Sequence, residues 1–440
     1  MINIEEMLKA TPAPCPACGK IHLAGVKEAC IESGAIKKLP AYIKKYGAKK
    51  AYILADCNTW KVAGAQVNEV LKENGIETAP YVLNMTRAEP DEHAIGSVAA
   101  HMDTSCDIFI SVGSGVINDL GKILANLCKL PYIIVGTAPS MDGYASGTSS
   151  IIRDGLKHSL PSKCADLVIG DLDVLCEAPM RMICAGVGDL FAKFISICEW
   201  RISKIITGEY FCEEIAGMVN QALQTCVDNL DGIVKRDRQA IKAVMDGMVL
   251  AGVSMNYATL SRPASGMEHY ISHICDMRAV EFNTPMDLHG IQCGVATVLS
   301  LRIYEKLRQI EKPDREKALA YAKSFRYEDW KVLLQKRLGK SAEAMIEIEA
   351  KEHKYDVALH EKRLEIILDK WEEIREVMNT LPTANEVEAL LRKIGAPTTL
   401  EELGFSKEDE KYAILMSKDI RDKYVGSRML WDLGLLEEFV

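Results

Sequence analysis

The stretch that decides the fold is residues 107–136, DIFISVGSGVINDLGKILANLCKLPYIIVG. It opens with a short apolar run, turns through small residues, and continues as an amphipathic run from Val116 to Cys128. A second apolar run, PYIIVG, closes it. Two buried strands joined by a helix of this length form a right-handed parallel crossover. The stretch therefore predicts a β–α–β unit within a parallel sheet that helices cover on both faces.

The same alternation of short apolar runs and amphipathic runs extends on either side of this unit. Further strands are expected at 29–33, 49–56, 78–84 and 167–175, and further helices at 34–46, 59–74 and 91–102. After residue 178 the pattern is almost entirely helical. The chain is therefore expected to contain an N-terminal arm (1–26), an α/β nucleotide-binding domain (27–178) and an all-helical domain (179–440).

The composition limits the classes of function that the chain can have. It has 440 residues, 48% of them hydrophobic and 26% charged, with a net charge of -9. This acidic balance argues against general binding to nucleic acid or to an anionic membrane. The opening sequence MINIEEMLKATPAP lacks the apolar core of a signal peptide, and no apolar run is long enough to span a membrane. The 14 cysteines are scattered, which favours reduced thiols in the cytoplasm.

The last third of the chain, Asp314 to Val440, is rich in charged residues at helical spacing. Residues 341–380 could form one long helix or two. The expected role is a solvated layer or a contact in a homo-oligomer, with His353 and His360 on the surface.

The N-terminal arm contains Cys15, Cys18 and His22 in the sequence CPACGKIH. A Cys-x-x-Cys pair followed by glycine resembles a zinc knuckle, but a structural zinc site takes four ligands. Cys30 is a distant candidate for the fourth. An arm with reduced thiols and no metal is the alternative.

Small residues follow the first strand of the opening unit. Gly113, Ser114 and Gly115 form its strand-to-helix turn, where backbone N–H groups and the helix dipole suit a phosphate. Glycine is also common in any tight turn of this kind. Asp56, at the end of another strand, could bind a ribose or could simply cap the next helix.

The second strand of the unit ends in a polar loop. Thr137, Ser140 and Asp142 follow it in the sequence GTAPSMDGYASGTSSII. Loops at the carboxyl ends of parallel strands are where open α/β sheets bind ligands. The run of hydroxyls and an acid is more than a plain turn requires.

Three of the nine histidines lie between Ser261 and Gly290. His269 and His273 are four residues apart and share one face if the segment is helical, and His289 precedes a further helical run. Asp189, expected at the start of a helix, could be only its N-cap or could join the histidines as a metal ligand. Three protein ligands leave a coordination position open, as a catalytic metal requires.

Basic residues near these candidates could bind an anionic substrate. Arg262 lies at the entrance to the histidine segment, and Lys157 and Lys193 are further candidates for a substrate phosphate. Ordinary surface positions are the alternative for each lysine.

Taken in order, several motifs resemble those of the sn-glycerol-1-phosphate dehydrogenases. They are GSGVINDLGK, TAPSMDGYAS, KHSLPSKCADLVIGDLDVL, GVGDLFAK, RPASGMEHYISH and LHGIQCGV. This family is part of the superfamily of iron-type alcohol dehydrogenases, glycerol dehydrogenase and 3-dehydroquinate synthase. The resemblance covers about residues 27–305; the cysteine arm and the last 130 or so residues are not diagnostic.

The resemblance implies a dehydroquinate synthase-like fold with an interdomain active site. It implies that Asp189, His269 and His289 bind a divalent ion, zinc, nickel or possibly iron. Asp142 would face the substrate, and His273 would contact it or relay a proton.

The resemblance also implies that NAD(H) or NADP(H) is bound at the glycine turn. Its pyrophosphate would lie at Gly113, Ser114, Gly115 and Asp119, with Thr137 and Ser140 near the nicotinamide. Asp56 favours NADH, because an acid at the ribose repels a 2′-phosphate.

The reaction implied is the reversible reduction of dihydroxyacetone phosphate to sn-glycerol-1-phosphate by hydride from the nicotinamide, with the metal polarising the carbonyl. Glycerol dehydrogenase is the nearest alternative, and 3-dehydroquinate synthase is less compatible because its Gly-His-x-x-Gly-His pattern is absent. A metal- and nucleotide-binding regulatory protein without turnover is the non-enzyme alternative.

Overall fold

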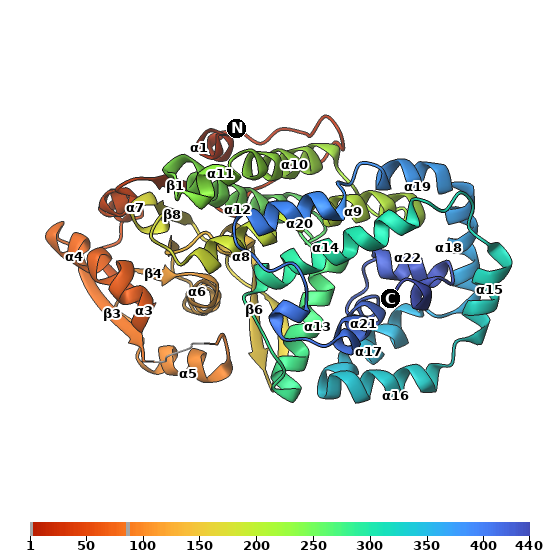
Figure 1. Ribbon diagram of the computed structural model, residues 1–440. Coiled ribbons are helices and arrows are strands. Elements are labelled where there is room, and N and C mark those ends of the chain that lie inside the picture. The colour runs from red at the N-terminus through yellow and green to blue at the C-terminus, as the bar shows by residue number, and fades with distance from the viewer. Residues whose placement is uncertain (1–2, 85–88) are drawn as a thin grey trace. The chain divides into compact units, whose positions relative to one another are not determined.

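The computed structural model describes residues 3–84 and 89–440, so Met1 and Ile2 of the expected arm lie outside it. Its opening unit has the predicted form: β4 (Ile108–Gly113), α6 (Gly115–Cys128) and β5 (Tyr132–Gly136) (Figure 1). Every residue of β4 and β5 is buried. Successive strand residues point to opposite faces of a sheet, so both faces here are covered.

The sheet is parallel throughout and has the strand order β1-β8-β5-β4-β2-β3. Besides β4 and β5 it contains β1 (Glu28–Glu32), β2 (Lys50–Asp56), β3 (Glu77–Leu83) and β8 (Leu167–Asp171). From β2 the chain moves outward to β3, and it then returns to place β4 on the other side of β2. This reversal makes the carboxyl ends of β2 and β4 a topological switch point, the usual ligand site of an open α/β sheet.

Different helices cover the two faces of the sheet. On one face, Ile110 and Ile133 pack in a core with Leu39 of α2 (Leu39–Lys45) and Leu71 of α4 (Ala65–Glu73). The other face meets α6.

The approach of α6 to the sheet depends on a glycine. A Cβ on Gly121 would stand 2.0 Å from the Ser111 Oγ and 2.7 Å from the Tyr132 ring. The Ser111 hydroxyl donates to the Ile117 carbonyl at 3.1 Å, which ties β4 to α6. The glycine therefore fixes how closely this helix lies on the strands.

Contacts along the chain divide it into two compact units. Unit 1 comprises residues 1–190 and 217–260, and unit 2 comprises residues 191–216 and 261–440. The other helical elements up to residue 258 are α1 (Ile4–Lys9), η1 (Ala35–Lys38), α3 (Cys57–Thr59), the π-helical turn η2 (Trp60–Gly64), α5 (Glu92–Ala100), η3 (Asp142–Ala145), α7 (Leu172–Leu175), α8 (Met180–Phe191), α9 (Lys193–Thr207), α10 (Glu213–Asp228), α11 (Leu230–Val234) and α12 (Arg238–Ala258).

The rest of unit 2 is helical. Its elements are α13 (Met267–Phe282), α14 (His289–Leu307), α15 (Arg315–Ser324), α16 (Tyr327–Leu338), η4 (Gly339–Ser341), α17 (Ala342–Glu352), α18 (Val357–Asp369), α19 (Trp371–Met378), α20 (Ala384–Lys393), η5 (Glu401–Leu403), α21 (Lys407–Ser417), α22 (Gly426–Asp432) and η6 (Leu436–Glu438). The expected sequence of an α/β part followed by helices is confirmed. Across residues 3–84 and 89–440, none of the helices combines the length and apolar character that crossing a bilayer requires.

An antiparallel hairpin, which the sequence pattern does not predict, interrupts the polar loop after β5. Its strands are β6 (Thr148–Arg153) and β7 (Leu156–Pro161). Asp154 and Gly155 form the turn, both with positive φ, at 55° and 75°. An Asp-Gly pair with two positive φ angles is a favoured two-residue hairpin connection.

Two expectations about the helices are wrong. Residues 341–380 form three helices, because His353 ends α17 in a left-handed conformation and Asp356 caps the start of α18. His360 is not on the surface: its side chain is fully buried, and its Nε2 lies 2.8 Å from the Asp432 carbonyl. The apolar stripe of this segment is narrow, and charged residues surround it. The sequence pattern therefore does not show that His360 belongs to the stripe.

Candidate active site

The glycine turn at the end of β4 lies next to the loop after β5, both in unit 1. A Cβ on Gly113 would stand 2.5 Å from the Ile117 Cβ, so the strand meets the helix without room for a side chain. The Thr137 amide donates to the Gly113 carbonyl at 3.1 Å, and the Ser114 and Ser140 hydroxyls are 2.5 Å apart. The structure therefore brings four of the candidate cofactor residues together at the carboxyl edge of the sheet.

The two acids assigned to the cofactor each have a structural partner. The Asp56 Oδ1 accepts hydrogen bonds from the amides of Asn58 and Thr59 at 2.7 and 2.8 Å, which caps α3. The Asp119 carboxylate accepts from the Ser150 amide at 3.2 Å and pairs with Lys122 at 3.0 Å. Asp56 stands at the switch point between β2 and β4, and its contact with a ribose stays a prediction.

Lys122 was not singled out from the sequence, yet it holds the loop that carries Asp142. Its side chain is 1% exposed. The Lys122 ammonium donates to the Gly143 carbonyl at 3.2 Å and to the Thr148 carbonyl, and it pairs with Asp119. A lysine in the second turn of an amphipathic helix gives no sequence indication that it points inward.

Asp142 and Asp189 meet through a backbone contact within unit 1. The Asp142 amide donates to the Asp189 Oδ2 at 2.9 Å. Asp189 is fully buried and lies in the last turn of α8, so the expectation that it starts a helix is wrong. Since α8 begins at Met180, N-capping does not explain a buried carboxylate at this position.

The three histidines between Ser261 and Gly290 form a cluster in unit 2. His269 and His273 lie on α13, and His289 is the first residue of α14. The ring centroids of His269 and His289 are 5.0 Å apart, and those of His273 and His289 are 5.8 Å apart. The packing of α13 against α14 thus brings together His269 and His289, which are twenty positions apart in the sequence.

A carboxylate and a hydroxyl orient two of these imidazoles. The Glu268 Oε1 lies 2.8 Å from the His269 Nδ1, and the Ser272 Oγ lies 3.1 Å from the His289 Nδ1. A metal-binding histidine characteristically bonds such a partner through one nitrogen and the metal through the other. The cluster therefore fits a divalent ion bound through the Nε2 atoms of His269 and His289.

Cys293, which was not predicted from the sequence, offers a further possible metal-ligand atom beside these imidazoles. Its Sγ lies 3.6 Å from the His289 Nε2, one helical turn along α14. The donor atoms of His269, His289 and Cys293 all lie within 4.8 Å of one another. The spacing of four between His289 and Cys293 was available in the sequence, but scattered cysteines gave no reason to select this one.

Two buried carboxyls support the start of α13. The Glu199 carboxylate accepts from the amides of Met267 and Gly426 at 2.9 and 2.8 Å and from the Tyr304 hydroxyl at 2.9 Å. Burial raises the pKa of Glu268, and burial together with the charge of Glu268 raises the pKa of Glu199. The pair favours retaining a proton, because two buried charges of one sign repel each other.

We expect Glu268→Gln to weaken metal binding while leaving the fold intact. The amide keeps the size of the carboxyl but loses the negative charge that strengthens the hydrogen bond to the His269 Nδ1. Loss of such an orienting contact lowers metal affinity by about 10–100-fold. Titration of the metal-free protein, together with its thermal midpoint, measures both properties. Glu281→Gln on the same helix is the matched control, and equal affinity in the two variants would contradict the positioning role.

The candidate phosphate ligands occupy three different environments. Lys157 lies on the hairpin strand β7. Lys193 is fully buried at the start of α9, and its ammonium donates to the Ala264 carbonyl at 3.2 Å. The alternative that Lys193 is an ordinary surface lysine is therefore wrong.

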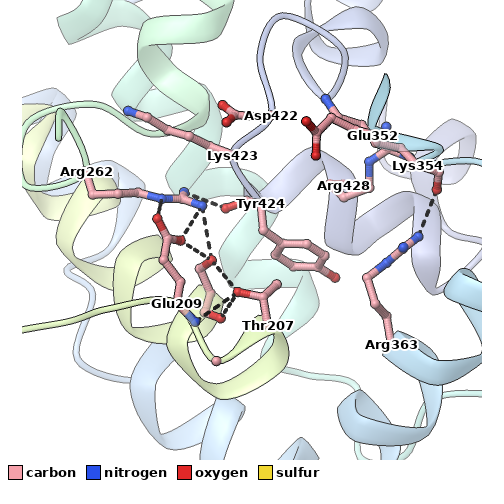
Figure 2. Close-up of a pocket in the computed structure, with 12 residues that line it drawn as sticks. Thr207, Glu209, Arg262, Glu352, Lys354, Arg363, Asp422, Lys423, Tyr424 and Arg428 are labelled. Carbon is pink, nitrogen blue, oxygen red and sulfur yellow. Dashed lines mark hydrogen bonds and ion pairs between the residues drawn. The ribbon is translucent and has the colours of Figure 1, made fainter. Parts of the chain in front are cut away.

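Arg262 lines a cavity of about 430 Å³ in unit 2 (Figure 2). Its guanidinium pairs with Glu209 at 2.7 Å and donates to the Tyr424 carbonyl at 2.7 Å. The side chain is 2% exposed. These contacts satisfy much of its charge within the protein, and its role as a phosphate anchor stays a prediction.

Comparisons with known proteins agree with the fold. A family described as iron-containing alcohol dehydrogenase matches residues 30–179. Glycerol dehydrogenase from Schizosaccharomyces pombe has a similar structure, with a TM-score of 0.63 at 17% identity over 96% of this chain and 91% of that one. The fold is thus that of the iron-containing alcohol dehydrogenase and glycerol dehydrogenase class.

Two sequence relatives narrow this class. The glycerol-1-phosphate dehydrogenase of Halalkalibacterium halodurans is 33% identical over 69% of this chain and 77% of its own length. That of Bacillus licheniformis is 29% identical over 99% of this chain and 96% of its own length. The chain belongs to the glycerol-1-phosphate dehydrogenase family.

Proposed function

We propose that the protein catalyses the reversible, NAD(P)H-linked reduction of dihydroxyacetone phosphate to sn-glycerol-1-phosphate. The observation that carries this proposal is the match to relatives named glycerol-1-phosphate dehydrogenase with NAD(P)+, one of which aligns over nearly the whole chain. The local geometry of each unit supports it. Unit 1 holds the glycine turn beside the Thr137 loop and the contact between Asp142 and Asp189. Unit 2 holds the oriented imidazoles of His269 and His289.

We propose that Asp189, His269 and His289 hold the divalent ion. A buried carboxylate with an amide donor and two oriented imidazoles are ligands that zinc, nickel and iron all accept. An ion bound there supplies Lewis-acid polarisation of the substrate carbonyl.

The protein's own groups then position the reactants. Asp142 faces the substrate, and His273 passes a proton to or from its oxygen. The pyrophosphate of the cofactor lies along the glycine turn at Gly113, Ser114 and Gly115, as the contact between this turn and the Thr137 loop supports. NADH is the preferred cofactor if Asp56 reaches the ribose.

The substrate phosphate separates this function from glycerol oxidation. Arg262, Lys157 and Lys193 are the proposed anchors, and a cation beside a phosphate contributes a strong charge-assisted contact. An enzyme with such a site discriminates against glycerol, which lacks the group that the cations bind.

A spectrophotometric assay tests the function. We expect NADH absorbance to fall when purified protein with zinc or nickel meets dihydroxyacetone phosphate. In the opposite direction, sn-glycerol-1-phosphate should be oxidised in preference to its 3-phosphate enantiomer and to glycerol. Preferential oxidation of glycerol would support glycerol dehydrogenase instead, and no turnover with any of them would reject the proposal.

We also propose a cytoplasmic homo-oligomer. The 14 cysteines are scattered along the chain, a pattern that favours reduced thiols in the cytoplasm. Light scattering on the purified protein measures the assembly, and a single-chain mass would contradict it.

A further inference from the structure

The Cys-x-x-Cys arm folds into a compact loop within unit 1. The Cys15 amide donates to the Lys20 carbonyl at 2.9 Å, and the Gly19 amide donates back to the Cys15 carbonyl at 2.8 Å. Gly19 has a φ of 71°, a conformation that favours glycine. A β-bridge between Pro14 and Ile21 closes the loop. The chain therefore holds both cysteines and the following histidine on one side of a tight turn.

The donor atoms of this loop have the spacing of a zinc site. The Cys18 Sγ lies 3.4 Å from the His22 Nε2. Zinc bonds of about 2.3 Å to sulfur and about 2.0 Å to nitrogen, at a tetrahedral angle, place these two atoms about 3.5 Å apart. The Cys15 Sγ belongs to the same group, in which all donor atoms lie within 4.8 Å of one another.

The imidazole of His22 is oriented from its other side. Its Nδ1 lies 3.1 Å from the Tyr257 carbonyl, and its ring stacks on the Tyr257 ring at 5.4 Å. A proton on Nδ1 that binds the carbonyl leaves Nε2 as the unprotonated nitrogen that faces Cys18. This is the arrangement by which a backbone carbonyl fixes the tautomer of a metal-binding histidine.

The middle of the arm leaves its large apolar side chains in solvent. Ile21 and Leu23 are 55% and 61% exposed, whereas Ile4 and Val26, near the two ends of the arm, are buried. A segment with so small a core commonly depends on a metal or a disulfide for its order. Soft thiolates and an imidazole select zinc among the common divalent ions.

The arm also packs against Cys164 and Asn256, which support the loop that carries Asp142. A Cβ on Gly25 would stand 2.9 Å from the Cys164 side chain and 3.0 Å from the Asn256 amide. The Asn256 amide in turn donates to the Ala145 carbonyl at 2.6 Å. An ordered arm therefore stabilises the hydrogen bond between the Asn256 amide and the Ala145 carbonyl, at the end of η3.

We propose that Cys15, Cys18 and His22 bind a structural zinc ion, separate from the catalytic metal, that fastens the N-terminal arm to α12. Binding releases the proton of each thiol to solvent and leaves the charge of the imidazole unchanged. A fourth donor completes the tetrahedron, since structural zinc is four-coordinate. This proposal stands independently of the proposed enzymatic function.

Metal counting by mass spectrometry on the full chain after dialysis tests it. We expect about one zinc ion fewer per chain in Cys15→Ser/Cys18→Ser than in the wild type, and no change in Cys128→Ser, whose thiol is exposed. Combining the double substitution with His289→Ala should remove both ions. Equal zinc in the wild type and in Cys15→Ser/Cys18→Ser would overturn the proposal.

Cobalt substitution covers the case in which the double variant does not fold. In folded His289→Ala protein loaded with cobalt, we expect the ultraviolet charge-transfer absorption of thiolate ligands, and His22→Ala should weaken the retention of cobalt. An organomercurial thiol reagent should release zinc from the unsubstituted protein. A cobalt spectrum without thiolate absorption would overturn the proposal irrespective of the variants.

Discussion

His289→Ala is expected to lose one metal ion per chain and to reduce turnover to the assay background, while its thermal midpoint stays near that of the metal-free wild type. The substitution removes one of three proposed protein ligands, and a catalytic metal held by two side chains is retained poorly. His289 is half-buried at the first position of α14, so its loss creates no core cavity. The Ser272 hydroxyl that faces its Nδ1 keeps a second partner in the Gln292 amide, at 3.0 Å.

Metal analysis, an NADH-coupled assay and thermal unfolding on the same samples separate the possible causes. His93→Ala, at an exposed position of α5, is the control for general effects of histidine removal. His273→Ala should keep the metal but turn over more slowly, because His273 is proposed to move a proton. Stoichiometric catalytic metal in His289→Ala would refute the ligand assignment and would point to Cys293 or His273 as its replacement.

Most of the sheet could be predicted from the sequence because its central strands are buried on both faces and form continuous apolar runs. Residues 107–136 show this directly: the strands and the helix between them lie within one or two residues of their expected bounds. The hairpin at 148–161 was missed because its strands contain many polar residues and are partly exposed. Local periodicity carries little information about a strand pair that does not belong to the main core.

The candidate site could be predicted only where residue type alone limits the role. Histidines are rare in this chain, and His269, His273 and His289 do cluster. Glu268, Lys122 and Cys293 are charged residues or thiols of common type, and their positions depend on tertiary packing. The groups that orient the expected residues were therefore found only in the structure.

Gly186→Ala is expected to damage both the fold and the proposed site of unit 1. A Cβ on Gly186 would stand 1.8 Å from the Pro139 carbonyl oxygen and 3.2 Å from the Val244 side chain. The first of these is backbone, which cannot rotate away, so α8 and the 137–142 loop must separate. Overpacking costs about 1–3 kcal/mol and occasionally more, and we expect about 3 kcal/mol here because a main-chain atom is displaced.

The same separation should reduce activity beyond the loss of stability. Asp189 lies three residues after Gly186, and the Asp142 amide that bonds it lies three residues after Pro139, so the 2.9 Å contact spans the displaced surfaces. A shift of about 1 Å in a catalytic group can lower the rate by about 100-fold. Denaturant unfolding and kcat at a temperature where the variant stays folded measure the two effects. The control is Gly96→Ala, because a Cβ at that exposed helical position meets no atom within 4 Å and should stabilise the protein slightly. Wild-type kcat and stability in Gly186→Ala would show that α8 does not position Asp189 through this contact.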